Sequence, residues 1–307
     1  MQKTYAAKRR AIARSNQNWQ LHVMLILPLL ALLVYNYLPM AGIVMAFQNY
    51  KPALGFAGSK WVGLKNFQLL YNLQGFRFAV RNSFVIAVGK IVLNLIVPVT
   101  FALMLNEMRN AHVKKVVQTV VYMPHFISWV LLASIVIRLL SVNGLVNKGI
   151  VALGGSAQTF LASKKAFQPI ILITDVWKEF GYGTIIYLAA MAGVDASLYE
   201  AAAIDGAGYW KRMIHVTLPA IAPTIVLMGT MALGRVLDAG FDQIFNLYSP
   251  AVYETADIID TFVYRMAFNN MQYSVSTAAG LFKNVISCVL ILVSYRLAYK
   301  FTGYRTF

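Results

Sequence analysis

The chain is dominated by long apolar stretches that are separated by shorter polar ones. A membrane core about 30 Å thick requires roughly 20 mostly apolar residues in each spanning helix. Six segments meet this requirement, namely Leu21–Phe47, Ser83–Leu105, Val116–Ile137, Pro169–Met191, Ala220–Phe241 and Ala278–Tyr299. Their apolar residues do not alternate with a period of two, which favours helices over a membrane barrel. The pattern predicts an all-α integral membrane protein with about six transmembrane helices.

Composition supports a membrane protein, because 59% of the residues are hydrophobic and only 12% are charged. A soluble domain of this length needs more polar residues to cover its surface. The first apolar stretch is too long for a signal peptide and contains Asn36 and Pro39, so we expect it to be a retained helix. We expect a basic cytoplasmic lead-in over residues 1–18 and one membrane domain over residues 19–307.

The formal net charge of +16 would suit a nucleic-acid partner, but the basic residues follow membrane topology instead. With the N-terminus inside, the inner segments carry more lysine and arginine than the outer segments do, as the positive-inside rule requires. We therefore expect both termini in the cytoplasm and no nucleic-acid partner.

Several kinds of chemistry lack their motifs in this chain. Cys288 is the only cysteine, so disulfides within the chain are excluded. No G-x-x-x-x-G-K-[ST] segment is present, so the chain has no P-loop for ATP. The histidines show no metal-ligand spacing; they are His22, His112, His125 and His215. We expect no metal, no cofactor in this chain and no enzymatic activity.

One polar segment, YEAAAIDGAGYWKRMIHVTLPAIAP from Tyr199 to Pro223, interrupts the apolar pattern between the fourth and fifth spans. Ser197 and Glu200 have the spacing of a capping box. The spacing predicts a short helix that breaks at Asp205-Gly206, then a second short helix over Tyr209–His215 that ends before Pro219. On these grounds alone, a capped connector at the membrane surface, in contact with lipid headgroups, is as good an interpretation as a functional element.

The same segment resembles the EAA loop of permease subunits of binding-protein-dependent ABC importers. That signature is Glu-Ala-Ala, three residues, Gly, nine residues, Ile, one residue and Leu-Pro. Glu200-Ala201-Ala202, Gly206, Val216 and Leu218-Pro219 match it, with Val216 in place of Ile. The additional matches are similar to the carbohydrate-uptake, maltose-permease-like branch; they are Tyr199, Ile204-Asp205-Gly206-Ala207, Trp210 and Pro223.

Other segments extend the resemblance to roughly residues 20 to 300. Phe47–Tyr50 and Trp61–Phe67 are similar to the first outer segment of sugar permeases. Asn36-Tyr37 and Tyr253–Asp257 resemble the subgroup that imports complex oligosaccharides and polysaccharides.

The resemblance implies that the loop over residues 194–219 is a cytoplasmic coupling helix that seats in an ATPase. It implies an ATPase-coupling role for Glu200, Ala201, Ala202, Asp205, Gly206, Ala207, Val216, Leu218 and Pro219. The implied partners are a second permease, two cytoplasmic ATPase subunits that hold ATP and Mg²⁺, and an extracytoplasmic solute-binding protein. The implied location is the bacterial inner membrane, and the implied function is ATP-driven import of an oligosaccharide.

Ionisable residues inside the spans are costly and either neutralise one another or line a pathway. Asp175 and Lys178, and again Arg235 and Asp238, are three residues apart on one helix face. Both interpretations stay open. The candidate translocation path comprises Lys90, Asn94, Asp175, Lys178, Tyr182, Tyr187, Arg235, Asp238, Lys283 and Asn284. Basic residues at Lys90, Arg235 and Lys283 would suit an acidic, uronate-containing sugar.

Two further predictions concern partners and alternatives. The outer segment with Glu254, Asp257 and Asp260 is a candidate contact for the binding protein, or else a solvated face. An ion-gradient-driven secondary transporter would instead use Asp175, Glu179 and Asp238 as proton or cation sites, but it would show inverted repeats, which the chain lacks. A membrane-embedded enzyme would need a catalytic constellation that is missing.

Overall fold

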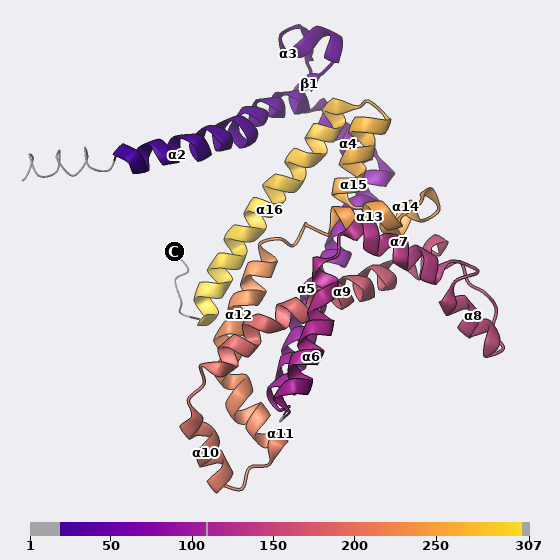
Figure 1. Ribbon diagram of the computed structural model, residues 1–307. Coiled ribbons are helices and arrows are strands. Elements are labelled where there is room, and N and C mark those ends of the chain that lie inside the picture. Colours follow the sequence, from indigo (N-terminus) through magenta and orange to yellow (C-terminus); the bar gives the residue numbers. More distant parts are fainter. Residues whose placement is uncertain (1–18, 109, 303–307) are drawn as a thin grey trace, which may run out of the picture.

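The computed structural model describes residues 19–108 and 110–302, so the lead-in predicted over residues 1–18 lies outside the described residues. Apart from one small hairpin, the described chain consists of helices and their connections (Figure 1). The helices are α2 (Trp19–Leu32), α3 (Gly55–Gly58), α4 (Lys65–Asn72), α5 (Gln74–Asn106), α6 (Ala111–Tyr122), α7 (Trp129–Leu140), α8 (Leu145–Ala152), α9 (Phe167–Ala192), α10 (Ala196–Ile204), α11 (Tyr209–Arg212), α12 (Leu218–Leu233), α13 (Phe241–Leu247), α14 (Tyr253–Ala256), α15 (Ile259–Tyr264) and α16 (Tyr273–Thr302).

Short 3₁₀ and π segments join several of these helices. The 3₁₀ segments are Leu38–Phe47, Pro52–Leu54, Met123–Phe126, Phe160–Ala162 and Pro250–Val252, and the π segments are Leu33–Tyr37, Met213–Thr217 and Arg265–Asn269. The hairpin pairs β1 (Gln48–Asn49) antiparallel to β2 (Lys60–Trp61), with Gln48 opposite Trp61 and Asn49 opposite Lys60. This hairpin and the α10–α11 loop lie at opposite ends of the long helices (Figure 1).

Five helical runs are long and apolar enough to cross a membrane. They are His22–Phe47, Gln74–Asn106, Trp129–Ala152, Tyr209–Leu233 and Tyr273–Ser294. A sixth crossing is obtained when α9 and α10, which meet at 74°, are counted as one bent span. The prediction of an all-α membrane protein with about six spans is confirmed. The 33 residues of α5 extend about 50 Å, well beyond the apolar core of a bilayer.

The third span was predicted wrongly as one continuous helix over Val116–Ile137. The chain instead leaves α6 at Tyr122, makes one 3₁₀ turn, and starts α7 at Trp129. Pro124 has no backbone N–H to continue the α-helical bonding pattern, and the Ser128 side chain caps the new helix by accepting a bond from Leu131 N.

The predicted fifth span, Ala220–Phe241, is also interrupted. Helix α12 ends at Leu233, and the backbone is irregular as far as Gly240, whose φ of +91° is in the left-handed region. That conformation favours glycine over any residue with a side chain. The residues from 234 to 240 therefore form a break within the membrane domain.

A π turn precedes each of two Leu-Pro pairs at the start of a helical segment. Leu38 N donates to Leu33 O, and Leu218 N donates to Met213 O, so in each case the bond spans five residues. A proline in a helix lacks the N–H that would bond four residues back, and its ring crowds that carbonyl. The wider turn relieves this conflict and lets the helix pass Pro39 and Pro219 without ending.

Three apolar clusters hold the helices together along the length of the molecule. The cluster nearest the hairpin contains Leu70, Phe76 and Phe262, and the cluster nearest the α10–α11 loop contains Val99, Leu103 and Ile221. The middle cluster is built from Ile86, Leu132, Phe167, Ile171, Ile244 and their neighbours. Helices α5 and α9 pack side by side and supply most of the scaffold around the charged residues described next.

Helix α2 and the π segment that follows it project away from the rest of the bundle, whereas the continuation over Leu38–Phe47 packs against α16 (Figure 1). No residue in the most apolar part of this run is buried by the described chain. The run therefore packs against lipid or against another chain.

Candidate functional site: a charged cavity and a protruding loop

A cavity of about 560 Å³ lies between α5, α9 and the break that follows α12. Charged, polar and aromatic side chains line it from all three sides. The lining residues include Lys90, Asn94, Trp129, Asp175, Glu179, Tyr187, Arg235, Asp238 and Gly240. A cavity with convergent polar groups in the interior of a membrane domain is the expected form of a solute pathway.

Lys90 and Asp175 form a buried ion pair across the α5–α9 contact. Lys90 Nζ lies 2.7 Å from Asp175 Oδ1 and donates a second bond of 2.5 Å to Gln243 Oε1. Asn94 Nδ2 donates to Asp175 Oδ2 at 2.8 Å. The Gln243 amide is itself fixed by bonds to Ile171 O and Thr174 Oγ1. The spacing left a pair of Asp175 with Lys178 open, but Asp175 pairs with Lys90 instead, because its side chain is directed towards α5.

Lys178 and Glu179 fasten α9 to the break between α6 and α7. Lys178 Nζ donates to His125 O at 2.6 Å and lies 3.1 Å from Glu179 Oε1. Glu179 Oε2 lies 2.7 Å from His125 Nδ1, and the His125 ring stacks on Tyr182 with ring centres 4.0 Å apart. Lys178 therefore bonds a carbonyl at the break, and the His125 ring packs between Glu179 and Tyr182.

Arg235 and Asp238 lie on the irregular segment after α12 and line the cavity. Both are exposed, and among the described residues neither side chain makes an ion pair or hydrogen bond. The sequence placed them three residues apart on one helical face, but the helix has ended before Arg235. They are therefore the charged groups of the cavity whose bonding capacity is unused within the described chain.

The structure brings together most of the predicted translocation path. Lys90, Asn94, Asp175, Tyr187, Arg235 and Asp238 line the cavity. Lys178 and Tyr182 belong to the adjoining network around His125. Lys283 and Asn284 do not line the cavity, and both oxygens of Asp260 hold Lys283 Nζ, at 2.6 and 2.7 Å.

Sequence reasoning missed three residues of this site. Gln243 bonds Lys90, Trp129 supplies an aromatic wall, and Gly240 leaves space for the lysine. A Cβ on Gly240 would lie 2.6 Å from Lys90 Nζ and would displace the lysine from its bonds, and the φ of +91° strains any residue other than glycine. The glycine-containing interruption at the end of the fifth span was the signal that could have located them.

The loop at the opposite end from the hairpin begins with α10. Its cap is Asp195, whose carboxylate accepts a bond from Ser197 N, and this bond lowers the pKa of Asp195. The predicted capping box of Ser197 and Glu200 is therefore wrong, because the helix begins one residue before Ser197. The predicted break at Asp205-Gly206 is confirmed, since α10 ends at Ile204 and Gly206 has φ of +70°.

The second arm of the loop differs from the prediction. Helix α11 does not end before Pro219 but continues through the π turn into α12. Tyr199 Oη and Thr217 Oγ1 lie 3.0 Å apart and join α10 to the base of this arm. The loop is therefore a rigid extension of a spanning helix.

The candidate coupling residues divide into an exposed tip and a partly buried base. Glu200, Ala201, Asp205 and Gly206 are exposed, whereas Ala202, Ala207, Val216 and Leu218 are partly buried, and Pro219 is exposed beside the π turn. Ile204 and Trp210 expose 87% and 67% of their surface, so the tip presents apolar area as well as the Glu200 carboxylate. Such a surface is typical of a docking site.

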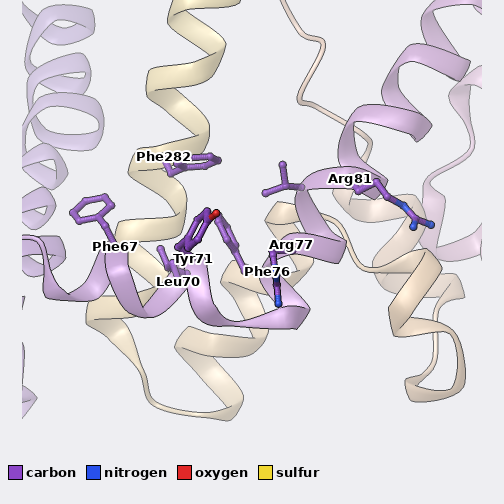
Figure 2. A pocket seen from close by; sticks show the side chains of 8 residues that line it. Phe67, Leu70, Tyr71, Phe76, Arg77, Arg81 and Phe282 are labelled. Carbon is purple, nitrogen blue, oxygen red and sulfur yellow. The ribbon is translucent and has the colours of Figure 1, made fainter.

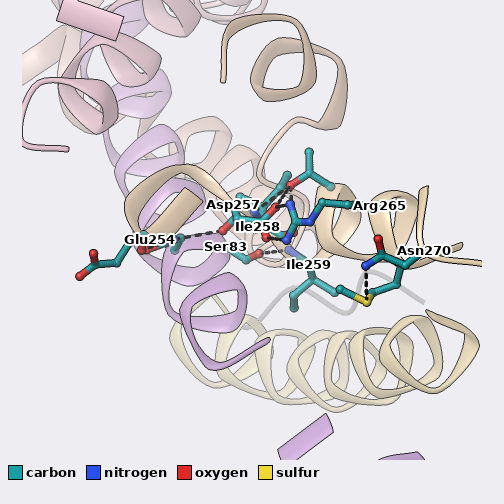
Figure 3. Close-up of polar contacts among 10 residues, drawn as sticks. Ser83, Glu254, Asp257, Ile258, Ile259, Arg265 and Asn270 are labelled. Carbon is teal, nitrogen blue, oxygen red and sulfur yellow. Dashed lines mark hydrogen bonds and ion pairs between the residues drawn. The ribbon is translucent and has the colours of Figure 1, made fainter. Parts of the chain in front are cut away.

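At the hairpin end, the acidic residues proposed as a protein contact pair with basic residues of the chain, and Figure 3 shows the pair of Asp257 and Arg265. Asp257 is buried and receives two bonds from the Arg265 guanidinium, and burial raises the pKa of Asp257. Glu254 pairs with Lys164, which lowers the pKa of Glu254. Asp260 pairs with Lys283. Of the three, only Glu254 is exposed, so the prediction of an acidic contact surface does not hold for Asp257 and Asp260.

A second cavity, of about 440 Å³, lies near the same end and is almost wholly apolar (Figure 2). Phe67, Leu70, Phe76 and Phe282 form its walls, and Arg77 and Arg81 border it from α5 with their guanidinium groups directed away from the aromatic rings. It offers few hydrogen-bonding groups for a sugar. The polar cavity is therefore the candidate pathway.

The model of the "binding-protein-dependent transport system inner membrane component" family matches residues 98–302. The match covers both arms of the loop and most of the polar cavity. The chain belongs to this family. Membership identifies it as a membrane component of a transport system and gives no support to the alternative of an ion-gradient-driven transporter.

Relatives of this permease are known in several sugar-transport systems. It is 41% identical over 295 residues to the polygalacturonan/rhamnogalacturonan transport system permease protein YteP of Bacillus subtilis, covering 96% of this chain and 92% of the relative. It is 27% identical over 245 residues to the lactose transport system permease protein LacF of Rhizobium radiobacter, covering 76% and 78%.

Two solved structures share the fold of this permease. A bacterial ABC transporter involved in the import of the acidic polysaccharide alginate matches with a TM-score of 0.88 and 35% identity, covering 95% of this chain and 99% of that one. A bacterial alginate ABC transporter in complex with an alginate pentasaccharide-bound periplasmic protein matches with a TM-score of 0.85 and 35% identity, covering 94% and 96%.

Proposed function

We propose that this chain is a permease subunit of an ABC importer for uronate-containing oligosaccharides. The observation that carries the proposal is the similarity, over nearly the whole chain, to a polygalacturonan/rhamnogalacturonan permease and to an alginate transporter. The polymers named for those relatives are rich in sugar acids, and the polar cavity contains the cationic groups of Lys90 and Arg235 beside the carboxylates of Asp175, Glu179 and Asp238.

The α10–α11 loop is the element that couples ATP hydrolysis to transport. Its exposed Glu200, Ile204 and Trp210 would dock on a cytoplasmic ATPase, while the base is continuous with α12. Because α12 leads directly to the break beside the cavity, a push on the loop would move Arg235 and Asp238. ATP and Mg²⁺ would bind to the partner subunits, and the oligosaccharide would cross unmodified by alternating access.

This mechanism implies an orientation of the chain in the membrane and a set of partner subunits. The loop faces the cytoplasm with both chain termini, and the hairpin end faces the binding protein that delivers the sugar. The exposed α2 run supports a second permease as neighbour, because its apolar face is unused within the described chain. Two ATPase subunits complete the complex.

Co-purification of the wild-type chain and Glu200→Arg from native membranes tests the coupling role. We expect the wild type to carry an ATPase and a second permease, and the variant to lose the ATPase by about tenfold because a charge contact is reversed. Glu107→Arg is the matched control, since Glu107 ends α5 near the same membrane surface but outside the loop. Equal ATPase recovery with Glu200→Arg would contradict this role.

Uptake by cells tests the substrate class. Cells with the intact system should accumulate labelled trigalacturonate only when the chain, the binding protein and ATP are all present. Uptake that persists without the binding protein or ATP, or a wild-type system that takes up only neutral oligosaccharides, would refute the proposal.

A further inference from the structure

Two interruptions of the membrane helices border the polar cavity. One lies between α6 and α7, where Trp129 contributes to the cavity wall, and the other follows α12, where Arg235, Asp238 and Gly240 contribute. Irregular backbone at membrane depth is tolerated where it lines a cavity, and substrate sites of transporters form at such interruptions. The cavity therefore has the architecture of a binding site rather than of a passive gap.

Most cationic groups near the pathway are already neutralised. Lys90 is held by Asp175 and Gln243, and Lys178 by Glu179 and the His125 carbonyl. Lys283 is held by both oxygens of Asp260, away from the cavity. A lysine whose donors are committed to buried partners cannot bind a substrate carboxylate without breaking those bonds, at a large cost.

Arg235 is the cationic group of the cavity whose donors have no partner within the described chain. Its side chain lines the cavity, is exposed, and has no ion pair or hydrogen bond among the described residues. A guanidinium presents two parallel N–H groups that match the two oxygens of a carboxylate. Bonding of this kind is stronger in a poorly solvated cavity than at an open surface.

A second unpartnered charged group lines the cavity three residues after Arg235. The Asp238 carboxylate has no ion pair or hydrogen bond among the described residues. Asn94 is not available in the same way, because its Nδ2 is fixed on Asp175 and its Oδ1 is fully buried. Sugar hydroxyls are donors, and the Asp238 carboxylate is an acceptor that could take their bonds.

We propose that Arg235 binds the carboxylate of a uronate residue in this cavity, while Asp238 accepts hydroxyl groups of the same sugar. This inference rests on the proposed function, which names the substrate class but not the residue that recognises it. The Lys90–Asp175 pair acts as a fixed, neutral frame for the site. Selectivity for acidic over neutral sugar at the permease then depends on Arg235.

Equilibrium binding to the purified complex, without the binding protein, tests this assignment. The probes are radiolabelled trigalacturonate and its fully methyl-esterified form, which has the same ring structure but no charge. The variants are Arg235→Gln, Arg235→Lys and the matched control Arg138→Gln, which removes an exposed arginine of α7 that does not line the cavity. Recovery of the complex and its basal ATPase activity report folding.

We expect the wild type to prefer the acid over the ester. Arg235→Gln should weaken trigalacturonate binding about tenfold and leave ester binding unchanged, because only the charged bond is lost. Arg235→Lys should retain part of the preference, since it keeps the charge but not the bidentate geometry. Arg138→Gln should behave as the wild type.

Three results would overturn the assignment: an unchanged preference in Arg235→Gln, an equal loss for acid and ester in an intact complex, or no preference in the wild type. Cellular uptake judges the proposed function separately. ATP-dependent uptake of trigalacturonate together with an unchanged preference in Arg235→Gln would leave the function standing and reject the role of Arg235.

Discussion

The ion pair of Lys90 and Asp175 places two opposite charges inside the membrane domain with less than a tenth of either residue exposed. Desolvation of each charge is offset by the other and by the amides of Gln243 and Asn94. Removing one charge leaves the other buried without compensation, whereas removing both leaves a neutral contact between α5 and α9.

Lys90→Met should therefore lower the free energy of unfolding of the purified protein by about 3–5 kcal/mol, because Asp175 loses its counter-ion. The double variant Lys90→Met/Asp175→Leu should recover the larger part of that loss, as a double-mutant cycle of SDS-induced unfolding would report. A double variant no more stable than Lys90→Met would show that the two side chains are not energetically coupled.

At this scale the sequence identified the ionisable residues but assigned some of their partners wrongly. The spacing of Asp175 and Lys178 determines only how these two residues are arranged on α9. Their bonds to Lys90 and His125 depend on how α9 packs against α5 and against the α6–α7 break. Spacing along one element carries no information about a partner that lies 85 residues earlier in the chain, so packing decided the outcome.

At the scale of single elements, the α10–α11 loop was predicted well where local backbone chemistry governs it. The break at Gly206 follows from a glycine after a helical run, and the structure has it there. The end expected before Pro219 was wrong because a π turn can carry a helix past a proline, and a π turn has no sequence signature of its own.

Gly206→Ala should strain this loop, because a left-handed residue with a Cβ costs about 1 kcal/mol. Amides of α10 should then exchange hydrogen roughly fivefold faster. Gly208→Ala is the matched control, with φ of −68° and, like Gly206, no atom within 4 Å of an added Cβ. Similar exchange rates in the two variants would mean that the backbone conformation of Gly206 does not limit the stability of the loop.

At the scale of the whole molecule, the α2 run places the polar residue Asn36 within the membrane without a hydrogen-bond partner for its side chain in the described chain. Asn36 is exposed in the middle of the first span, and its side chain has no hydrogen bond in the described part of the chain. An amide at membrane depth gains about 1 kcal/mol from a partner on a neighbouring helix. The number of spans was predictable from hydropathy, but the separation of this helix from its own bundle was not, because apolar residues face lipid and protein alike.

Asn36→Leu should therefore weaken association with the second permease by about fivefold, because the interhelical bond is lost. Asn36→Gln keeps the amide and should retain most of the association. Dissociation of the purified complex on dilution in detergent gives the measurement. If Asn36→Leu holds the second permease as firmly as the wild type, the helix faces lipid instead.

With the proposed second permease as the neighbour of α2, the lifetime of this protein would depend on the synthesis of that neighbour. A subunit made in excess would leave Asn36 unsatisfied in the bilayer and its first helix undocked, which is the kind of incomplete fold that membrane proteases remove. Pulse–chase labelling should then give a several-fold shorter half-life when the second permease is absent. The cell would thereby match the amounts of the two subunits without any dedicated regulator, through the rate at which unassembled copies are degraded.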